Sequence, residues 1–160
     1  MKRSILLALA AIVFTAVGVS AQTPEEWQAS DARIAEMQEL SELPKATKLA
    51  SIDGLATELH DTAMGTIKIT ESLKSLMQAP DLALALELSE GIKAEATALS
   101  DAVQKVEAVL DEVKGIRNPL QIASATKSVN YSQKAIRLVG EENVFHAKVI
   151  VGIIDSLQGE

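Results

Sequence analysis

The sequence predicts an all-α fold: an elongated antiparallel up-down bundle of three long helices plus a shorter N-terminal helix. Apolar residues recur at spacings of three and four over most of the chain, which is the periodicity of a helix with one buried face. Proline and asparagine stand where new helices would begin, as they commonly do at helix starts. The connections between these segments are short, so successive helices should run antiparallel.

Ahead of the bundle, residues 1–21 are predicted to be a cleavable secretory signal peptide. Two basic residues precede an apolar run over 5–19, and Val19-Ser20-Ala21 supplies a small-residue cleavage site. That run would form only about 22 Å of helix, against roughly 30 Å of membrane hydrocarbon. We therefore expect residues 22–160 to be a single helical-bundle domain in the periplasm or the medium after bacterial-type export, without stable membrane insertion.

The first two helices are predicted from capping residues and from Pro44. The string Thr23-Pro24-Glu25-Glu26 combines an N-cap, a proline in the first turn and a capping-box glutamate. This helix should end near Leu43, and Pro44 should open a second helix over about 45–78. The second helix has a heptad seam with threonine in its middle, formed by Ile52, Leu55, Leu59, Thr62, Thr66, Ile69, Leu73 and Leu76.

The third and fourth helices follow two further turns. A tight turn over 78–81 should start a helix that runs to about Lys114, with Gly115 as its C′ residue. Asn118-Pro119 then caps and opens the fourth helix. Gly140 could end that helix and leave 149–154 as a strand. The apolar seam keeps its phase across Gly140, however, so we predict one helix to about Leu157.

Composition narrows the classes of function. Loss of residues 1–21 takes the formal net charge from −7 to −9, because the segment carries two basic residues and no acidic ones. A strongly acidic surface disfavours nucleic acids and anionic lipids. The chain has no cysteine, which excludes disulfides, thiolate zinc sites and covalent haem attachment. Catalytic motifs such as G-x-S-x-G and H-E-x-x-H are missing, so we expect neither an enzyme nor a metal site.

Two polar residues interrupt the fourth seam. His146 lies on the otherwise aliphatic face, one turn after Asn143, whereas His60 lies beside its seam and is expected at the rim. One interpretation is a buried polar layer in which Asn143, His146 and Thr66 satisfy one another and fix the register of the bundle. Another is metal capture through His146, Glu142 and Asn143.

A third interpretation comes from counting helix levels. Met37 and His146 lie at similar distances from one end of the predicted bundle, at a level that Met64 also approaches, and His with Met is a known axial pair for haem iron. The string Asn143-Val-Phe-His-Ala-Lys148 resembles the last helix of the periplasmic b-type four-helix-bundle cytochromes. That resemblance implies haem b held by Met37 and His146, with Met64 as a substitute ligand, and a role in electron transfer.

The function that we expect first is a non-enzymatic exported bundle that acts by protein–protein contact or as a structural module. A short first helix would leave a three-helix section at the other end of the bundle. An apolar surface there could take a partner helix or a second copy of the chain. No cofactor belongs to this expectation, and haem b belongs only to the alternative.

Overall fold

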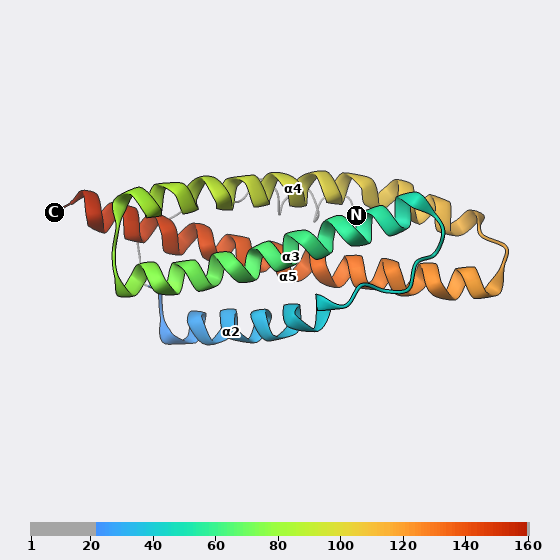
Figure 1. The fold of residues 1–160 in the computed structure, drawn as a ribbon, viewed down its shortest axis with the longest axis horizontal. Coiled ribbons are helices and arrows are strands. Elements are labelled where there is room, and N and C mark those ends of the chain that lie inside the picture. Colours follow the sequence, from blue (N-terminus) through green and yellow to red (C-terminus); the bar gives the residue numbers. More distant parts are fainter. Residues whose placement is uncertain (1–21, 160) are drawn as a thin grey trace.

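The computed structural model describes residues 22–159 and contains helices without strands in that part of the chain. The bundle consists of α2 (Pro24–Gln38), the 3₁₀ turn η2 (Glu39–Ser41), α3 (Ala50–Gln78), α4 (Leu82–Gly115) and α5 (Pro119–Gln158). Figure 1 shows three long helices lying side by side, with the shorter α2 along one part of them. The predicted all-α bundle is thus confirmed, whereas the predicted signal peptide lies outside the described residues.

Local capping explains where two of the helices begin. The Thr23 side chain accepts a hydrogen bond from the Glu26 amide, and the Glu26 side chain accepts one from the Thr23 amide, which completes the predicted capping box. Asn118 caps α5 by accepting from the Leu120 amide. Helix α5 then runs without interruption through Gly140, so the single long helix is confirmed.

The start of α3 differs from the prediction. Pro44 does not open that helix; residues 42–49 instead form an extended strap, and the helix begins only at Ala50. The Asp53 carboxylate accepts hydrogen bonds from the amides of Thr47 and Lys48 and from the Thr47 hydroxyl. Lys48 takes a positive φ of 66°. These bonds hold the strap in a non-helical path that sequence periodicity does not encode.

The ends of the first and third helices also differ from the prediction. The first helix ends at Gln38 and tightens into η2, short of the expected Leu43. The third helix begins at Leu82, directly after the predicted turn, and Asp81 caps it by accepting a hydrogen bond from the Leu84 amide. Gly115 is the last residue of α4 and does not take the left-handed conformation expected of a C′ glycine.

The core is divided into two apolar clusters. The central cluster surrounds Leu59 and Leu138 and takes Met37 and Leu40 from the α2–η2 segment. The end cluster surrounds Leu73, Ile92 and Val149. Between them, along α3, α4 and α5, the buried side chains are polar; they include Thr66, Thr70, Glu95, Glu142, Asn143 and His146. A polar layer therefore interrupts an otherwise aliphatic core.

Helix α2 covers only part of the bundle, as expected, and the strap continues from it to the start of α3 (Figure 1). The Tyr131 hydroxyl donates to the Leu40 carbonyl over 2.7 Å, and the Gln121 amide donates to the Thr47 carbonyl over 3.3 Å. The strap therefore partly covers the three-helix section. No helix within residues 22–159 has the length and apolarity needed to cross a membrane.

Candidate functional site

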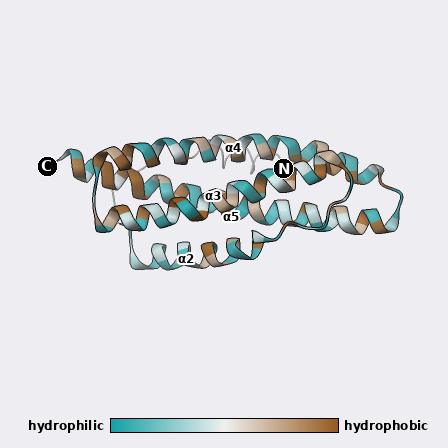
Figure 2. Cartoon of the chain, in the orientation of Figure 1, coloured by the Kyte–Doolittle hydropathy of each residue, from teal (hydrophilic) through white to brown (hydrophobic). Residues whose placement is uncertain are grey.

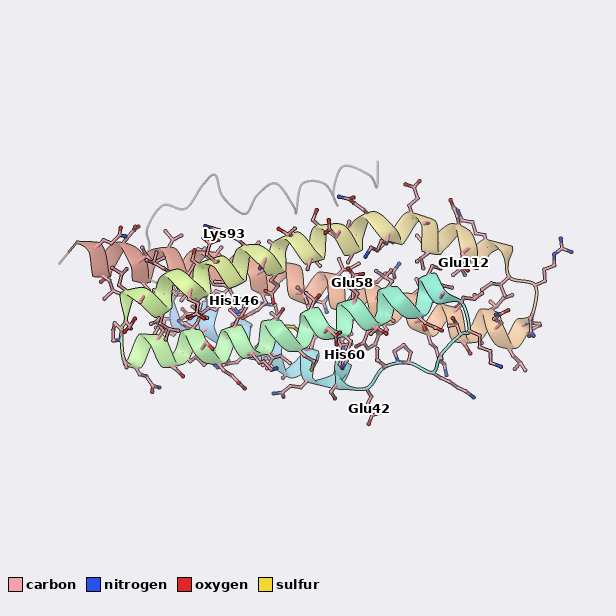
Figure 3. The ribbon with its side chains drawn as sticks, turned by 45° about the horizontal axis from the view of Figure 1, so that its top comes forward. Glu42, Glu58, His60, Lys93, Glu112 and His146 are labelled. Carbon is pink, nitrogen blue, oxygen red and sulfur yellow. The ribbon has the colours of Figure 1, made fainter. Side chains whose placement is uncertain are left out.

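The polar layer is built around three residues of α5. Glu142, Asn143 and His146 lie within little more than one helical turn, and all three side chains are buried, with exposed fractions of 0%, 2% and 0%. Because residues three and four apart share a helix face, His146 lies on the same face of α5 as Glu142 and Asn143, one turn further along. Figure 3 shows His146 in the interior of the bundle and His60 further along α3.

Glu142 connects the layer to α2. Its Oε1 accepts a hydrogen bond from the Ser30 hydroxyl, and its Oε2 accepts one from Arg33 Nε at 2.7 Å. Burial alone would raise the pKa of this carboxyl. Hydrogen bonds from His146, Ser30 and Arg33 outweigh it, and the pKa of Glu142 falls to about 2. The residue is therefore an ionised carboxylate at neutral pH.

Helix α3 contributes the hydroxyl of Thr70. Thr70 Oγ1 lies 2.7 Å from His146 Nε2 and also donates toward Glu142 Oε1 at 3.2 Å. His146 Nε2 itself is 3.3 Å from Glu142 Oε1. One hydroxyl therefore bridges the imidazole and the carboxylate, and it fixes the orientation of the ring.

Helix α4 contributes a second buried carboxyl, Glu95. The Thr66 hydroxyl donates to Glu95 Oε1 over 2.6 Å. Asn143 Nδ2 donates to Glu95 Oε2 over 3.1 Å and to the Ile92 carbonyl over 3.0 Å. Burial raises the pKa of Glu95, an effect that these hydrogen bonds and the nearby His146 only partly offset. The pKa values of the two carboxyls in the layer are therefore shifted in opposite directions.

The geometry brings together Asn143, His146 and Thr66, the three residues expected to form a polar layer. They do not contact one another as a simple triad, because Glu95 lies between Thr66 and Asn143. His146 Nδ1 is 4.0 Å from Glu95 Oε2. The layer unites side chains from all four helices, and its carboxyls and imidazole are almost completely buried, so these groups are placed to hold protons and to contact neighbouring helices.

The two methionines expected near His146 lie elsewhere. Met37 is a member of the central cluster and Met64 packs against it. Glu36 pairs with Arg137, so Met37 lies near the level of Arg137, about nine residues or roughly 14 Å along α5 from His146. The structure does not bring Met37 and His146 to one level, and they do not form an axial pair that fits haem.

An axial offset between two helices accounts for this difference. The counting of levels assumed that α2 begins where α5 ends. Glu26, in the first turn of α2, instead pairs with Lys148, although α5 continues to Gln158. Helix α5 therefore extends about ten residues beyond its contact with the start of α2, and every level counted from that end is displaced.

His60 and the residues considered for metal capture are held by local hydrogen bonds. His60 is half-buried, with Nδ1 3.0 Å from Asp61 Oδ1 and Nε2 3.3 Å from the Ser41 carbonyl, which agrees with a rim position. Within residues 22–159, no group of three or more His, Cys, Asp or Glu side chains is arranged to hold a metal ion. The set His146, Glu142 and Asn143 is instead occupied by hydrogen bonds within the layer.

Sequence reasoning missed Glu95 and Arg33 as members of the layer, and it considered Glu142 only as a possible metal ligand beside His146. Carboxylates are normally exposed, so the burial of Glu95 and Glu142 does not follow from the sequence. One signal was available, because threonine in the middle of the α3 seam indicates a level at which facing helices should offer polar partners. Comparisons with known proteins add no relative, since no family model, curated protein or solved structure matches the chain.

Proposed function

We propose that this chain is an exported, non-enzymatic helical-bundle protein that binds a protein partner through the turn between α3 and α4. The observation that carries the proposal is a set of exposed apolar side chains, here called the apolar hairpin end. It comprises Met77, Leu82, Leu84 and Leu86, which keep 48%, 37%, 40% and 47% of their surface exposed. Exposed apolar groups gathered in one place are typical of contact surfaces.

The surroundings of the hairpin end support this proposal. Leu82 and Leu86 are one turn apart and share a flank of α4. Figure 2 shows hydrophobic residues gathered where the start of α4 lies beside the end of α5. A surface hollow of about 470 Å³ adjoins Met77 and is also lined by Trp27, Asp31, Lys74 and Gln78. Aromatic and methionine side chains are enriched at protein interfaces.

Charge indicates the chemistry of the partner. Asp81, Glu87 and Asp155 are exposed near this end, and Glu87 and Asp155 form no ion pair with the described residues. The basic residues nearby are engaged: Lys74 pairs with Asp31 and Lys93 with Glu90. The partner surface that fits is apolar at its centre and carries lysine or arginine at its rim, because such charges would complement the carboxylates.

The buried layer supports a non-enzymatic role for the bundle. Its imidazole and carboxylates are the chain's main candidates for acid–base chemistry, yet Glu142 and His146 have no exposed surface. A general acid or base must come within hydrogen-bond reach of its substrate. The layer is therefore better suited to holding the helices in register than to catalysis.

Site-specific photo-crosslinking in the producing cells tests the contact. A photoreactive residue at Leu84 or Leu86 should capture a discrete protein partner, whereas one at the exposed Lys127 on α5 should not. Leu86→Asp should reduce capture from the neighbouring position 82 at least tenfold. Equal capture at positions 84 and 127, or none at either, would contradict the proposal; capture of the chain itself would identify a second copy as the partner.

Export is tested separately by the mass of the protein recovered from the periplasm or medium. Cleavage after Ala21 should yield a chain that begins at Gln22. A cytoplasmic product that retains residues 1–21 would overturn this part of the proposal and leave the contact surface untouched.

A further inference from the structure

Two buried polar atoms at the centre of the layer have no hydrogen-bond partner among residues 22–159: Asn143 Oδ1 and His146 Nδ1. Both side chains are almost completely buried, and both belong to one face of α5. Buried polar groups are nearly always hydrogen-bonded, so two such atoms on neighbouring residues point to a bound molecule. We propose that Glu95, Asn143 and His146 form a binding site for one water molecule, across which Glu95 and His146 share one proton.

The distances fit a water bridge. His146 Nδ1 and Glu95 Oε2 are 4.0 Å apart, too far for a direct hydrogen bond. Two hydrogen bonds of about 2.8 Å that meet at roughly a right angle on a water oxygen span that separation. Buried waters typically make about three hydrogen bonds. Asn143 Oδ1 supplies the third partner on the same helix face.

The surrounding hydrogen bonds determine which way the water is oriented. Asn143 Nδ2 is engaged by Ile92 and Glu95, so its Oδ1 is the amide atom left to accept a hydrogen bond. On the other side of the ring, Nε2 is engaged by Thr70. The water therefore accepts a hydrogen bond from His146 Nδ1–H, and it donates its own two protons to Asn143 Oδ1 and Glu95 Oε2.

The charge of the layer requires one proton on this pair. Arg33 from α2 balances the ionised Glu142 from α5, and α3 contributes only the hydroxyls of Thr66 and Thr70. The remaining groups are Glu95 from α4 and His146. With one proton between them the layer is neutral; with none or two, it carries an unbalanced buried charge, which is costly.

The exchange between the two neutral forms balances through the water. In one form His146 is an imidazolium and Glu95 a carboxylate. In the other, the Nδ1–H bond has broken and its proton has passed to the water oxygen, while a proton of that water has formed a bond to Glu95 Oε2. The water is regenerated, and no further reactant is needed.

Nuclear magnetic resonance of the purified exported protein tests both parts of the proposal. The chain has only two histidines, so His60→Gln leaves His146 as the single imidazole signal. The ring protons of His146 should show a cross-peak to a long-lived water. A proton shared with Glu95 should give Nδ1 a nitrogen chemical shift between those of a protonated and an unprotonated ring nitrogen. Glu95→Gln preserves shape but cannot take the proton, so the Nδ1 shift should move to one of these two limits.

Glu90→Gln, an exposed substitution on the same helix, should leave the Nδ1 shift unchanged and is the matched control. An unchanged Nδ1 shift in Glu95→Gln would overturn the shared proton. A His146 ring without a water cross-peak, or with a direct bond to the Glu95 carboxyl, would overturn the water site. Each result is read from the folded protein, because an isosteric substitution at Glu95 retains the packing of the layer.

Discussion

The polar layer and the central cluster lie side by side in the same three long helices, yet they hold those helices together in different ways. In the central cluster, Leu59 and Leu138 are fully buried among aliphatic neighbours. In the polar layer, Glu142 and His146 are just as deeply buried but are held by hydrogen bonds of fixed direction. Aliphatic side chains can repack after a small slide of one helix along another, whereas directional bonds cannot.

This difference shows how one bundle can divide the tasks of its core. The aliphatic clusters supply most of the apolar burial, which is the dominant favourable contribution to folding. The polar layer contacts α2 through Ser30 and Arg33, and we expect its directional bonds to favour a single alignment of the helices. A buried polar group that selects register at some cost in stability is well known in coiled coils.

The largest effect is expected from Glu142→Ala. The substitution leaves Arg33 and Ser30 without the carboxylate that accepts their hydrogen bonds, and loss of one partner from a buried ion pair costs about 3–5 kcal/mol. Urea denaturation measures the free energy of unfolding. Glu141→Ala is the matched control, since its carboxylate is an exposed neighbour that pairs with Arg137. Equal losses in the two variants would contradict a special role for the layer.

A loss of roughly 3 kcal/mol is expected for Leu59→Ala, which opens a cavity in the central cluster. Because no ionisable group of the layer is affected, the loss should be the same at pH 4 and pH 7. The loss from Glu142→Ala, in contrast, should shrink as the pH falls. Denaturation of both variants at the two pH values makes this comparison, and a pH-dependent loss for Leu59→Ala would erase the distinction between the two regions.

Acid should weaken the native protein through Glu142. Its pKa is lowered from 4.5 to about 2, so its stabilising contribution is present above about pH 4.5 and is lost as the pH falls toward 2. The loss should amount to roughly 3 kcal/mol. Glu95 acts in the opposite direction, because a raised pKa stabilises the folded state at low pH and is lost as pH rises. Measurements of the free energy of unfolding against pH for Glu142→Gln and Glu95→Gln separate the two contributions, since each substitution should remove the pH dependence that comes from one carboxyl.

The smallest effect is expected at helix glycines. Gly54 in α3 has no atom within 4 Å of an added Cβ, so Gly54→Ala should stabilise the protein by about 0.5–1 kcal/mol. At Gly65 the added Cβ would lie 3.8 Å from Glu95 Oε1, beside the polar layer, and the gain should be smaller. Thermal melts compare the two variants. An equal gain at both positions would indicate that the layer tolerates a neighbouring methyl group as well as the aliphatic region does.

Much of the fold could be predicted because its signals are local. The cap at Thr23, the cap at Asn118 and the unbroken phase of the seam across Gly140 each depend on residues within a few helical turns. The start of α3 could not be predicted in this way. The start of this helix depends on the Asp53 side chain, which accepts hydrogen bonds from residues that precede the helix. Such bonds cannot be predicted from the periodicity of apolar residues.

The site was predictable only in part, for a related reason. Asn143, His146 and Thr66 interrupt apolar seams, so their burial follows from helix geometry. Glu95 and Glu142 are buried because partners on other helices meet them, and which side chains meet depends on the axial alignment of helices. That alignment is also why Met37 proved to be far from the level of His146.

The strap of residues 42–49 has a consequence for how α2 stays in place. Within helix α2, the buried residues are Ser30 and Met37. An isolated helix of this length is marginally stable in water. The strap acts as a tether of about 27 Å that keeps α2 at a high effective concentration near its docking face. Local opening of α2 is therefore readily reversed while the strap is intact. A single proteolytic cut in the strap would turn that intramolecular contact into a bimolecular one, so that α2, once opened, would return to the three long helices much less readily.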